Sequence, residues 1–222
     1  MAMRKIKVEE FDRRVDFFDQ MAQSSWLSKL HDELIQKTGS WATKYVLDVG
    51  CGTGRLLLKG ADSSTAITGI DLSKEMVKRA KENVRTTPFQ KVPIFLEGDA
   101  EKLPFQENQF DIVLSTCVVF LLPEPSKALK EMYRVLKYGG SLVLLNPSKH
   151  LTEKYAEELS KQWGLEGMEK ETLLQWGRIS EKRHQYTEET MNQLLIECHF
   201  TPIEHTFSLE QIALLTFATK KS

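Results

Sequence analysis

The chain of 222 residues is long enough to bury the core of one α/β domain. Hydrophobic residues make up 41% and charged residues 27% of the sequence, which is typical of globular proteins and not of disordered or membrane-embedded chains. A formal net charge of -1 gives no general attraction to nucleic acid or to anionic lipid. These properties favour a site for a small molecule over a nucleic-acid or membrane surface.

The cysteines and the N-terminus indicate the compartment. Cys51, Cys117 and Cys198 lie too far apart in sequence to form the closely spaced pairs of structural zinc or redox motifs. Residues 1–18 mix basic with acidic side chains and contain no apolar run of signal-peptide or membrane-spanning length. We therefore expect a reduced, cytoplasmic protein with no metal site.

The first half of the chain alternates helical and strand patterns. Residues 11–34 carry aromatic side chains among charged ones and predict one or two helices. Residues 45–49 form a short apolar run that predicts a strand, and glycine punctuation and a helix start at residues 55–59 follow. Residues 66–70 predict a second strand that ends at Asp71.

The central region continues the alternation. Ser73 is a predicted N-cap for an amphipathic helix that runs to about Val84. Apolar residues at helical spacing predict another helix over residues 125–136, which the Gly139-Gly140 pair would end. Three more strands are predicted at residues 92–96, 110–114 and 141–145. Strands that alternate with helices predict a parallel sheet, because a parallel neighbour requires a crossover connection.

The tail breaks this alternation. Polar helical patterns at residues 151–165 and 188–198 are followed by two strand-like runs, 203–209 and 212–219, with almost no gap between them. Such a short connection closes only an antiparallel hairpin. The sequence thus predicts a doubly wound, mostly parallel α/β sheet with a C-terminal antiparallel hairpin.

The sharpest motif is the glycine-rich turn at residues 46–54, with the spacing G-x-G-x-G after a strand. Glycine allows the backbone to turn steeply and to lie against a ligand. A dehydrogenase fingerprint would need glycine at position 55, where Arg55 stands. Taken alone, the pattern also fits a tight strand-to-helix turn with no ligand.

Two acidic positions follow the next two strands. Asp71 could accept hydrogen bonds from both ribose hydroxyls of a nucleoside, or could serve only as a favourable helix N-terminal residue. Asp99 could accept from an adenine amino group while Ala100 offers its backbone N–H, or both could lie in a solvated loop. The glycine turn and these residues fall in order at the carboxyl ends of consecutive strands, where open α/β sheets bind ligands.

With these motifs, residues 45–147 resemble class I S-adenosylmethionine (SAM)-dependent methyltransferases, in particular the methyltransferase type 11 group. The resemblance implies a seven-stranded Rossmann-like sheet in a single domain over residues 1–222. It divides that domain into an N-terminal helical cap (1–44), a SAM-binding core (45–147), a variable insert (148–186) and a C-terminal helix and hairpin (187–222).

The resemblance also implies the cofactor, SAM, with S-adenosylhomocysteine (SAH) as product. Asp71 would bind the ribose, and Asp99 and Ala100 the adenine, while the glycine turn and Thr116 would contact the methionine part. The implied cofactor-binding residues are Asp48, Gly50, Cys51, Gly52, Gly54, Asp71, Leu72, Met76, Asp99, Ala100 and Thr116. The helical cap would cover the cofactor and shape the acceptor pocket, or would simply pack on the sheet.

No catalytic residue is assigned. Residues 118–122 are wholly apolar where many relatives carry a histidine or acidic residue, often at the place of Leu121, and Tyr138 stands where proline is frequent. Of the five histidines, His150 and His184 are the first to examine, although a structural or exposed position is favoured for each. Methyl transfer itself is an in-line displacement that depends largely on alignment of the two substrates.

Three functions remain open at this point. The favoured one is a SAM-dependent methyltransferase acting on a small molecule, with neither nucleic acid nor membrane as partner and with a monomeric or homodimeric state. An NAD-type Rossmann oxidoreductase shares the glycine turn and Asp71, but Arg55 and the terminal hairpin oppose it. A SAM-binding protein without catalysis is supported by the apolar segment 118–122.

Overall fold

The sheet is the frame on which the site is built. The computed structural model describes residues 3–85 and 87–221, and in this part of the chain seven strands form one sheet in the order β3-β2-β1-β4-β5-β7-β6. β7 runs antiparallel to both of its neighbours, and the other strands are parallel to one another. The strands are β1 (Tyr45–Val49), β2 (Ala66–Asp71), β3 (Ile94–Glu97), β4 (Phe110–Thr116), β5 (Leu136–Pro147), β6 (Ile203–Ser208) and β7 (Ala213–Thr219). The predicted doubly wound sheet and its C-terminal hairpin are confirmed.

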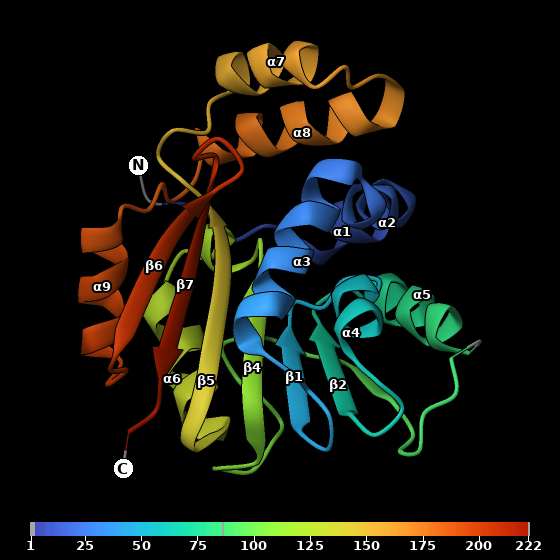
Figure 1. Ribbon diagram of the computed structural model, residues 1–222, viewed down its shortest axis with the longest axis vertical. Helices are drawn as coiled ribbons and strands as arrows, with labels where there is room; N and C mark the ends of the chain where they lie inside the picture. Colours follow the sequence, from blue (N-terminus) through green and yellow to red (C-terminus); the bar gives the residue numbers. More distant parts are fainter. Residues whose placement is uncertain (1–2, 86, 222) are drawn as a thin grey trace.

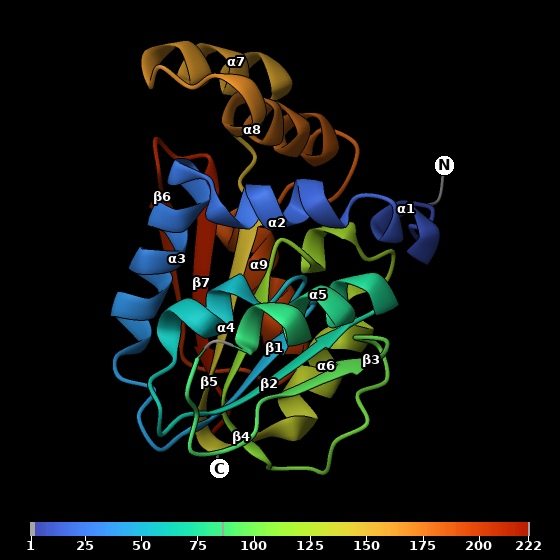
Figure 2. The same ribbon diagram turned by 90° about the vertical axis from the view of Figure 1, so that its right-hand side faces the viewer.

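Helices cover both faces of this sheet and the edge where the parallel strands end. α3, α4 and α5 pack on one face and α6 and α9 on the other, while α1, α2, α7 and α8 lie beyond the carboxyl ends of the parallel strands (Figures 1 and 2). The helices are α1 (Val8–Asp12), α2 (Val15–Gln23), α3 (Ser25–Thr38), α4 (Arg55–Gly60), α5 (Lys74–Val84), α6 (Pro125–Val135), α7 (Glu153–Gln162), α8 (Gly167–Ser180) and α9 (Glu188–Glu197), with a 3₁₀ turn η1 (Val119–Leu121). None of the described helices is long and apolar enough to cross a bilayer.

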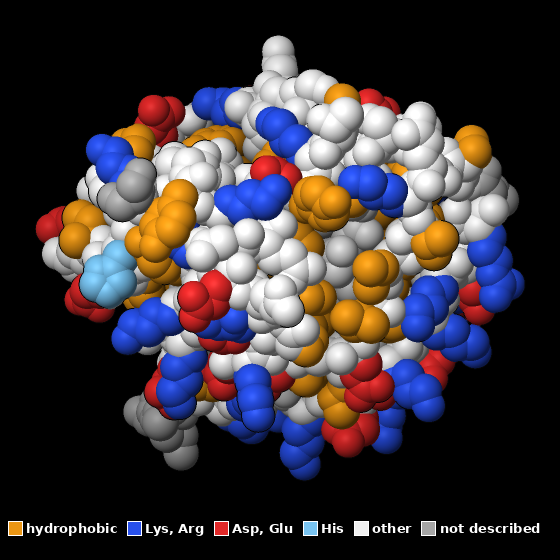
Figure 3. All heavy atoms as spheres, turned by 90° about the horizontal axis from the view of Figure 1, so that it is seen from below, with side chains coloured by type: hydrophobic (Ala, Val, Ile, Leu, Met, Phe, Trp, Pro, Cys, Tyr) orange, Lys and Arg blue, Asp and Glu red, His pale blue; other side chains and the backbone are white. Residues whose placement is uncertain are grey.

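The core follows from the apolar runs in the sequence. Most side chains of the central strands β1, β4 and β5 are buried, because helices cover both faces there, and Tyr45 and Tyr138 near the strand starts are exposed. The edge strand β3 exposes Ile94 and Leu96 instead. At the end of the molecule away from α7 and α8, Lys and Arg side chains alternate with Asp and Glu around scattered apolar ones (Figure 3), so no surface of one charge sign forms there.

The Gly139-Gly140 pair does not end the helix that precedes it. α6 stops at Val135, and the extended residue Leu136 already pairs with Phe110, so the glycines lie inside β5. A Cβ on Gly140 would lie 2.8 Å from the carbonyl oxygen of Lys137, and glycine therefore permits a close approach of backbones at an irregularity in the β4–β5 pairing.

The N-terminal region forms three helices where the pattern predicted one or two. The Ser24 side chain separates α2 from α3 by accepting a hydrogen bond from the backbone of Leu27 at 3.4 Å. Trp26 of α3 stacks on Trp176 of α8 with ring centroids 5.1 Å apart. The helical cap is thus packed against the insert, beside the strand ends that the sequence motifs mark.

Candidate active site

The glycine turn begins where β1 ends. The backbone N–H groups of Gly50 and Cys51 both donate to the carbonyl oxygen of Ile70 on β2, at 2.7 and 3.0 Å. Gly50 has φ +78°, and a Cβ placed there would lie 2.2 Å from a methyl carbon of Val118. Only glycine fits this bend, because any side chain would be strained and would clash with the segment after β4.

Asp71 ties the end of β2 to this turn. One carboxylate oxygen accepts from the Gly52 backbone N–H at 2.8 Å, and the other accepts from the Ser73 N–H at 2.9 Å. Burial raises the pKa of Asp71, and the two backbone hydrogen bonds oppose that rise. Ser73 is the predicted N-cap, and its hydroxyl oxygen accepts from the Met76 N–H at 3.1 Å. Asp71 is therefore held in one orientation at the cavity.

Asp99 stands after β3, on the same edge of the sheet. It accepts from the Glu101 N–H at 3.0 Å and pairs with the Lys5 ammonium at 2.7 Å. Burial would raise the pKa of Asp99, but the Lys5 hydrogen bond and the Glu101 N–H together lower it. Lys5 also reaches Glu101, so the N-terminal segment lies across the predicted adenine subsite.

Asp48 lies beneath the turn and is 1% exposed. Burial, and in second place the charge of Asp71, raises the pKa of Asp48 to about 8. One of its carboxylate oxygens has no hydrogen-bond partner among the described residues. An unpaired buried carboxylate is costly, so this site is suited to a ligand that brings a positive charge or a hydrogen-bond donor.

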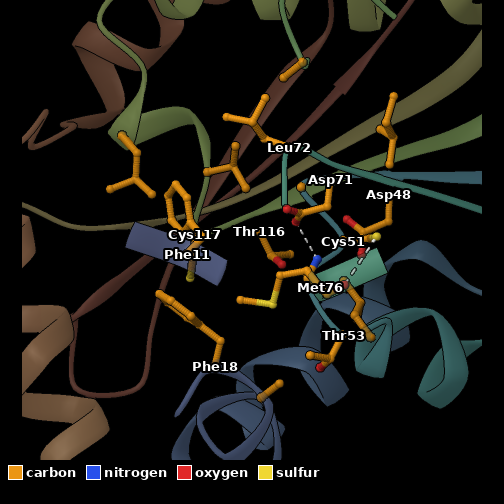
Figure 4. Close-up of a pocket in the computed structure, with 18 of the residues that line it drawn as sticks. Phe11, Phe18, Asp48, Cys51, Thr53, Asp71, Leu72, Met76, Thr116 and Cys117 are labelled. Atoms are coloured by element: carbon orange, nitrogen blue, oxygen red, sulfur yellow. Dashed lines mark hydrogen bonds between the residues drawn. The ribbon is translucent and has the colours of Figure 1, made fainter. Parts of the chain in front are cut away.

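These residues surround one cavity of about 200 Å³. In Figure 4, Asp48, Asp71 and Cys51 lie on one side of it, Phe11 and Phe18 on the other, and Thr116 and Met76 between them. Every predicted cofactor residue except Gly54 lines this cavity. Gly54 instead caps α4 at φ +78° and packs against Phe95 and Ala80, so it shapes the turn without reaching the cavity.

The helical cap supplies the other wall. Phe11 of α1, Phe18 and Met21 of α2, and Leu27 and His31 of α3 all line the cavity. A bidentate pair holds α2 over the turn, because the Arg55 guanidinium donates two hydrogen bonds of 2.9 Å to Asp19. The side chain of Asn83 on α5 adds a hydrogen bond to Asp19 and another to the Thr53 carbonyl oxygen.

Sequence patterns did not mark several of these lining residues. Aromatic residues in 11–34 suggested a cap, but nothing in the sequence singled out Lys5, His31 or the partner of Arg55. The two histidines named first do not line the cavity: His150 is exposed beside Phe207, and the His184 ring contacts the Leu122 carbonyl oxygen at 3.0 Å. Cys117 does line it, but burial raises its pKa to about 12, so its thiol stays protonated.

Comparison with known proteins shows similarity to methyltransferases. Residues 47–144 match the family model described as a methyltransferase domain. Phosphatidylethanolamine N-methyltransferase of Cereibacter sphaeroides is 41% identical over 101 residues, which cover 46% of this chain and 49% of that protein. Demethylmenaquinone methyltransferase of Symbiobacterium thermophilum is 32% identical over 148 residues, covering 64% and 59%. The chain thus spans about half to three fifths of the length of these relatives.

Solved structures extend the likeness in fold to nearly the whole chain. The [4+2]-cyclase SpnF has a TM-score of 0.74 at 18% identity, with 100% of this chain and 98% of that chain covered. A SAM-dependent methyltransferase from Aquifex aeolicus has a TM-score of 0.68 at 19% identity, with 97% and 100% covered. Magnesium protoporphyrin IX methyltransferase from Synechocystis, solved with bound SAH, has a TM-score of 0.62 at 19% identity, with 87% and 82% covered.

Residues 47–144 thus match a methyltransferase domain, and the chain has the fold of solved SAM-dependent methyltransferases. These matches bear out the resemblance seen in the sequence, and SAM is the cofactor that the matched methyltransferases imply. The residues of the cavity fit that cofactor. The unpartnered oxygen of Asp48 suits its ammonium group, and the fixed carboxylate of Asp71 suits two vicinal hydroxyls.

Proposed function

We propose that this protein transfers the methyl group of SAM to a small, largely apolar molecule, as a single cytoplasmic domain. The observation that carries the proposal is the convergence on one cavity of the glycine turn and the carboxylates of Asp48, Asp71 and Asp99. These residues would hold the cofactor in the roles that the sequence resemblance implies. Binding of SAM would supply an activated methyl group on a sulfonium.

The acceptor would occupy the apolar wall of the same cavity. Phe11, Phe18, Leu121 and Leu122 line it and offer contact area without charge. The relatives named for demethylmenaquinone and phosphatidylethanolamine support this proposal, because both compounds are largely apolar. In-line transfer needs the acceptor atom held close to the methyl carbon, and a shaped apolar wall can provide that alignment.

Isothermal titration with SAM and with SAH tests the cofactor part. We expect both to bind the wild-type protein, and we expect Asp71→Asn to weaken SAM binding about 10- to 100-fold, as befits the loss of charge-assisted hydrogen bonds to two hydroxyls. Asp111→Asn is the matched control, because Asp111 lies near the start of β4 and pairs with Lys137 outside the cavity. Absence of heat with both ligands would remove the proposal.

A SAM-binding protein that transfers no methyl group is the second candidate. It is favoured by the apolar turn η1, whose own residues supply no acidic or basic side chain, and by the full-length fold match to a cyclase. Incubation with SAM and a fractionated metabolite extract separates the two: formation of SAH supports transfer, and tight SAM binding without SAH in any fraction supports the second candidate.

A further inference from the structure

His31 is a buried histidine that faces the cavity without a partner. It lies on α3, one turn after Leu27, is 4% exposed and lines the cavity. Neither ring nitrogen makes a hydrogen bond to any residue in 3–85 or 87–221. Because a buried polar group is normally hydrogen-bonded, such a ring indicates a ligand that supplies the missing partner.

The position of α3 assigns His31 to the end of the cavity away from adenosine. α3 contacts α2, α4, α8 and β5, whereas the predicted ribose and adenine subsites lie at the ends of β2 and β3. The aromatic side chains of Phe11 and Phe18 lie across the cavity from Asp48 and Asp71 (Figure 4). α3 therefore places His31 at a part of the cavity wall away from the ends of β2 and β3.

The other charged side chains of the cavity already form hydrogen bonds or ion pairs, or lie where they cannot take a proton from the methyl-accepting molecule. Asp71 binds two backbone N–H groups, Lys5 pairs with Asp99, and Arg55 pairs with Asp19. The remaining acid, Asp48, lies under the glycine turn, where the cofactor's amino group is expected. This leaves His31 as the neutral proton acceptor on the helical-cap side of the described cavity.

We propose that His31 is a catalytic residue that accepts the proton of an apolar acceptor bearing a weakly acidic hydroxyl group, such as a phenol, enol or hydroquinone. The inference rests on the proposed methyl transfer. The acceptor O–H proton passes to the imidazole nitrogen, and its electron pair reaches the oxygen or the conjugated carbon that attacks the methyl carbon. The methyl–sulfur bond breaks, its electron pair stays on sulfur to give SAH, and the proton leaves from His31 to solvent.

The environment of His31 favours acceptor molecules whose hydroxyl group is weakly acidic. Burial, and in second place the ammonium of Lys59 on α4, lowers the pKa of His31 to about 4, and Asp32 on α3 partly opposes this shift. Asp48 on β1 lines the same cavity. The ring is thus neutral at physiological pH and free to accept a hydrogen bond, yet it is a weak base. An aliphatic alcohol would hold its proton too strongly, whereas a phenolic or enolic proton is within reach when its transfer is coupled to methyl transfer.

A pair of probes of different acidity tests the inference. The wild-type protein and His31→Gln are assayed at pH 7.5 with SAM and either 1-naphthol, which is neutral, or 4-nitro-1-naphthol, which is largely ionised. Methylated product and SAH are quantified by mass spectrometry. We expect His31→Gln to lower the rate at least tenfold with 1-naphthol and less than twofold with the ionised probe, because the latter needs no base. The affinity for SAM should change less than twofold.

His150→Gln is the matched control, because His150 is exposed and outside the cavity, and it should behave as wild type. His31→Phe keeps the buried ring and should show the same dependence on the probe if His31→Gln folds poorly. An equal loss with both probes would reduce His31 to a structural role. A wild-type protein that binds SAM but methylates neither probe would refute the proposed class of hydroxyl-bearing acceptors. Failure to bind SAM would refute the proposed function instead.

Discussion

Asp48 offers the sharpest test of how the site is built, because the free protein bears a cost there that a cofactor would relieve. Its carboxyl group is buried beneath the glycine turn, and one oxygen lacks a partner among the described residues. The pKa is about 8 in the folded protein against 3.8 for an ordinary aspartate. Asp48→Asn replaces this carboxyl group with a neutral amide of the same shape.

The sign and size of the effect follow from proton linkage. Between pH 3.8 and 8 the folded state binds the Asp48 proton more tightly than the unfolded state, so the free energy of unfolding falls as pH rises through that window. At about 1.4 kcal/mol per pH unit, the cost at pH 7 reaches about 4 kcal/mol. The buried amide keeps part of this cost, so we expect Asp48→Asn to stabilise the free protein by about 2 kcal/mol, or roughly 4–8 °C in Tm.

Cofactor binding should move in the opposite direction. The ammonium group of SAM would favour the ionised carboxylate, so binding at pH 7 should release nearly one proton from the wild-type protein and almost none from Asp48→Asn. Titration in two buffers of different ionisation enthalpy measures this release. We also expect the variant to bind SAM about tenfold more weakly.

Glu157→Gln is the matched control, because Glu157 is an exposed acid on α7 outside the cavity. Urea unfolding at pH 6, 7 and 8 should show the wild-type stability falling with pH and the Asp48→Asn stability nearly flat, with the control following wild type. A variant that is less stable than wild type across this range, with unchanged proton release, would refute the assigned burial cost.

Three further substitutions test how the site is held together. Gly50→Ala should lower the free energy of unfolding by about 3 kcal/mol in urea and should abolish SAM binding, because φ is +78° and the new Cβ would overlap a valine methyl group. A variant as stable as wild type would show that the turn tolerates a side chain at this position. Asp19→Asn should lower the free energy of unfolding by about 2 kcal/mol by breaking the bidentate pair with Arg55, and limited proteolysis should then cut first in the helical cap. An unchanged cleavage pattern would show that this pair does not hold the cap in place. Trp176→Leu should cost about 2–3 kcal/mol in thermal unfolding through the lost stacking on Trp26, with the affinity for SAM retained.

Local chemistry is what made the placement of the acidic residues in the cavity predictable. Asp71 ends an apolar run and precedes a helix cap, so its place at the carboxyl end of a parallel strand followed from the sequence pattern alone. The same holds for Asp99, since consecutive parallel strands end on one edge of the sheet. That these side chains meet at one cavity is a consequence of topology.

The part of the cavity that the helical cap lines was not predictable, because it depends on pairings between distant segments. Lys5 pairs with Asp99 across 94 positions, and Asp19 pairs with Arg55 across 36. No spacing rule links such residues, since a helix that covers a sheet can dock at several angles. The inward orientation of His31 depends on the same docking.

The helix α8 was missed for a different reason. It begins at Gly167 after Glu166, which provides no side-chain cap, and its buried residues include polar Thr172 and Ser180. A helix that packs between the cap and α7 lacks the single apolar stripe that reveals a surface helix. In the same way, the Gly139-Gly140 pair looked like a helix end, although its role is a close backbone contact in β5.

The charges of the cavity explain how one site could both hold a cofactor and release its product. Asp48, Asp71 and Asp99 line it, and Lys5 neutralises Asp99. SAM would bring an ammonium and a sulfonium toward the carboxylates that remain, and Coulomb attraction is strong where water is excluded. Methyl transfer turns the sulfonium into a neutral thioether, so the product would lose part of that attraction. Substrate would therefore be held more tightly than product by the same acidic residues.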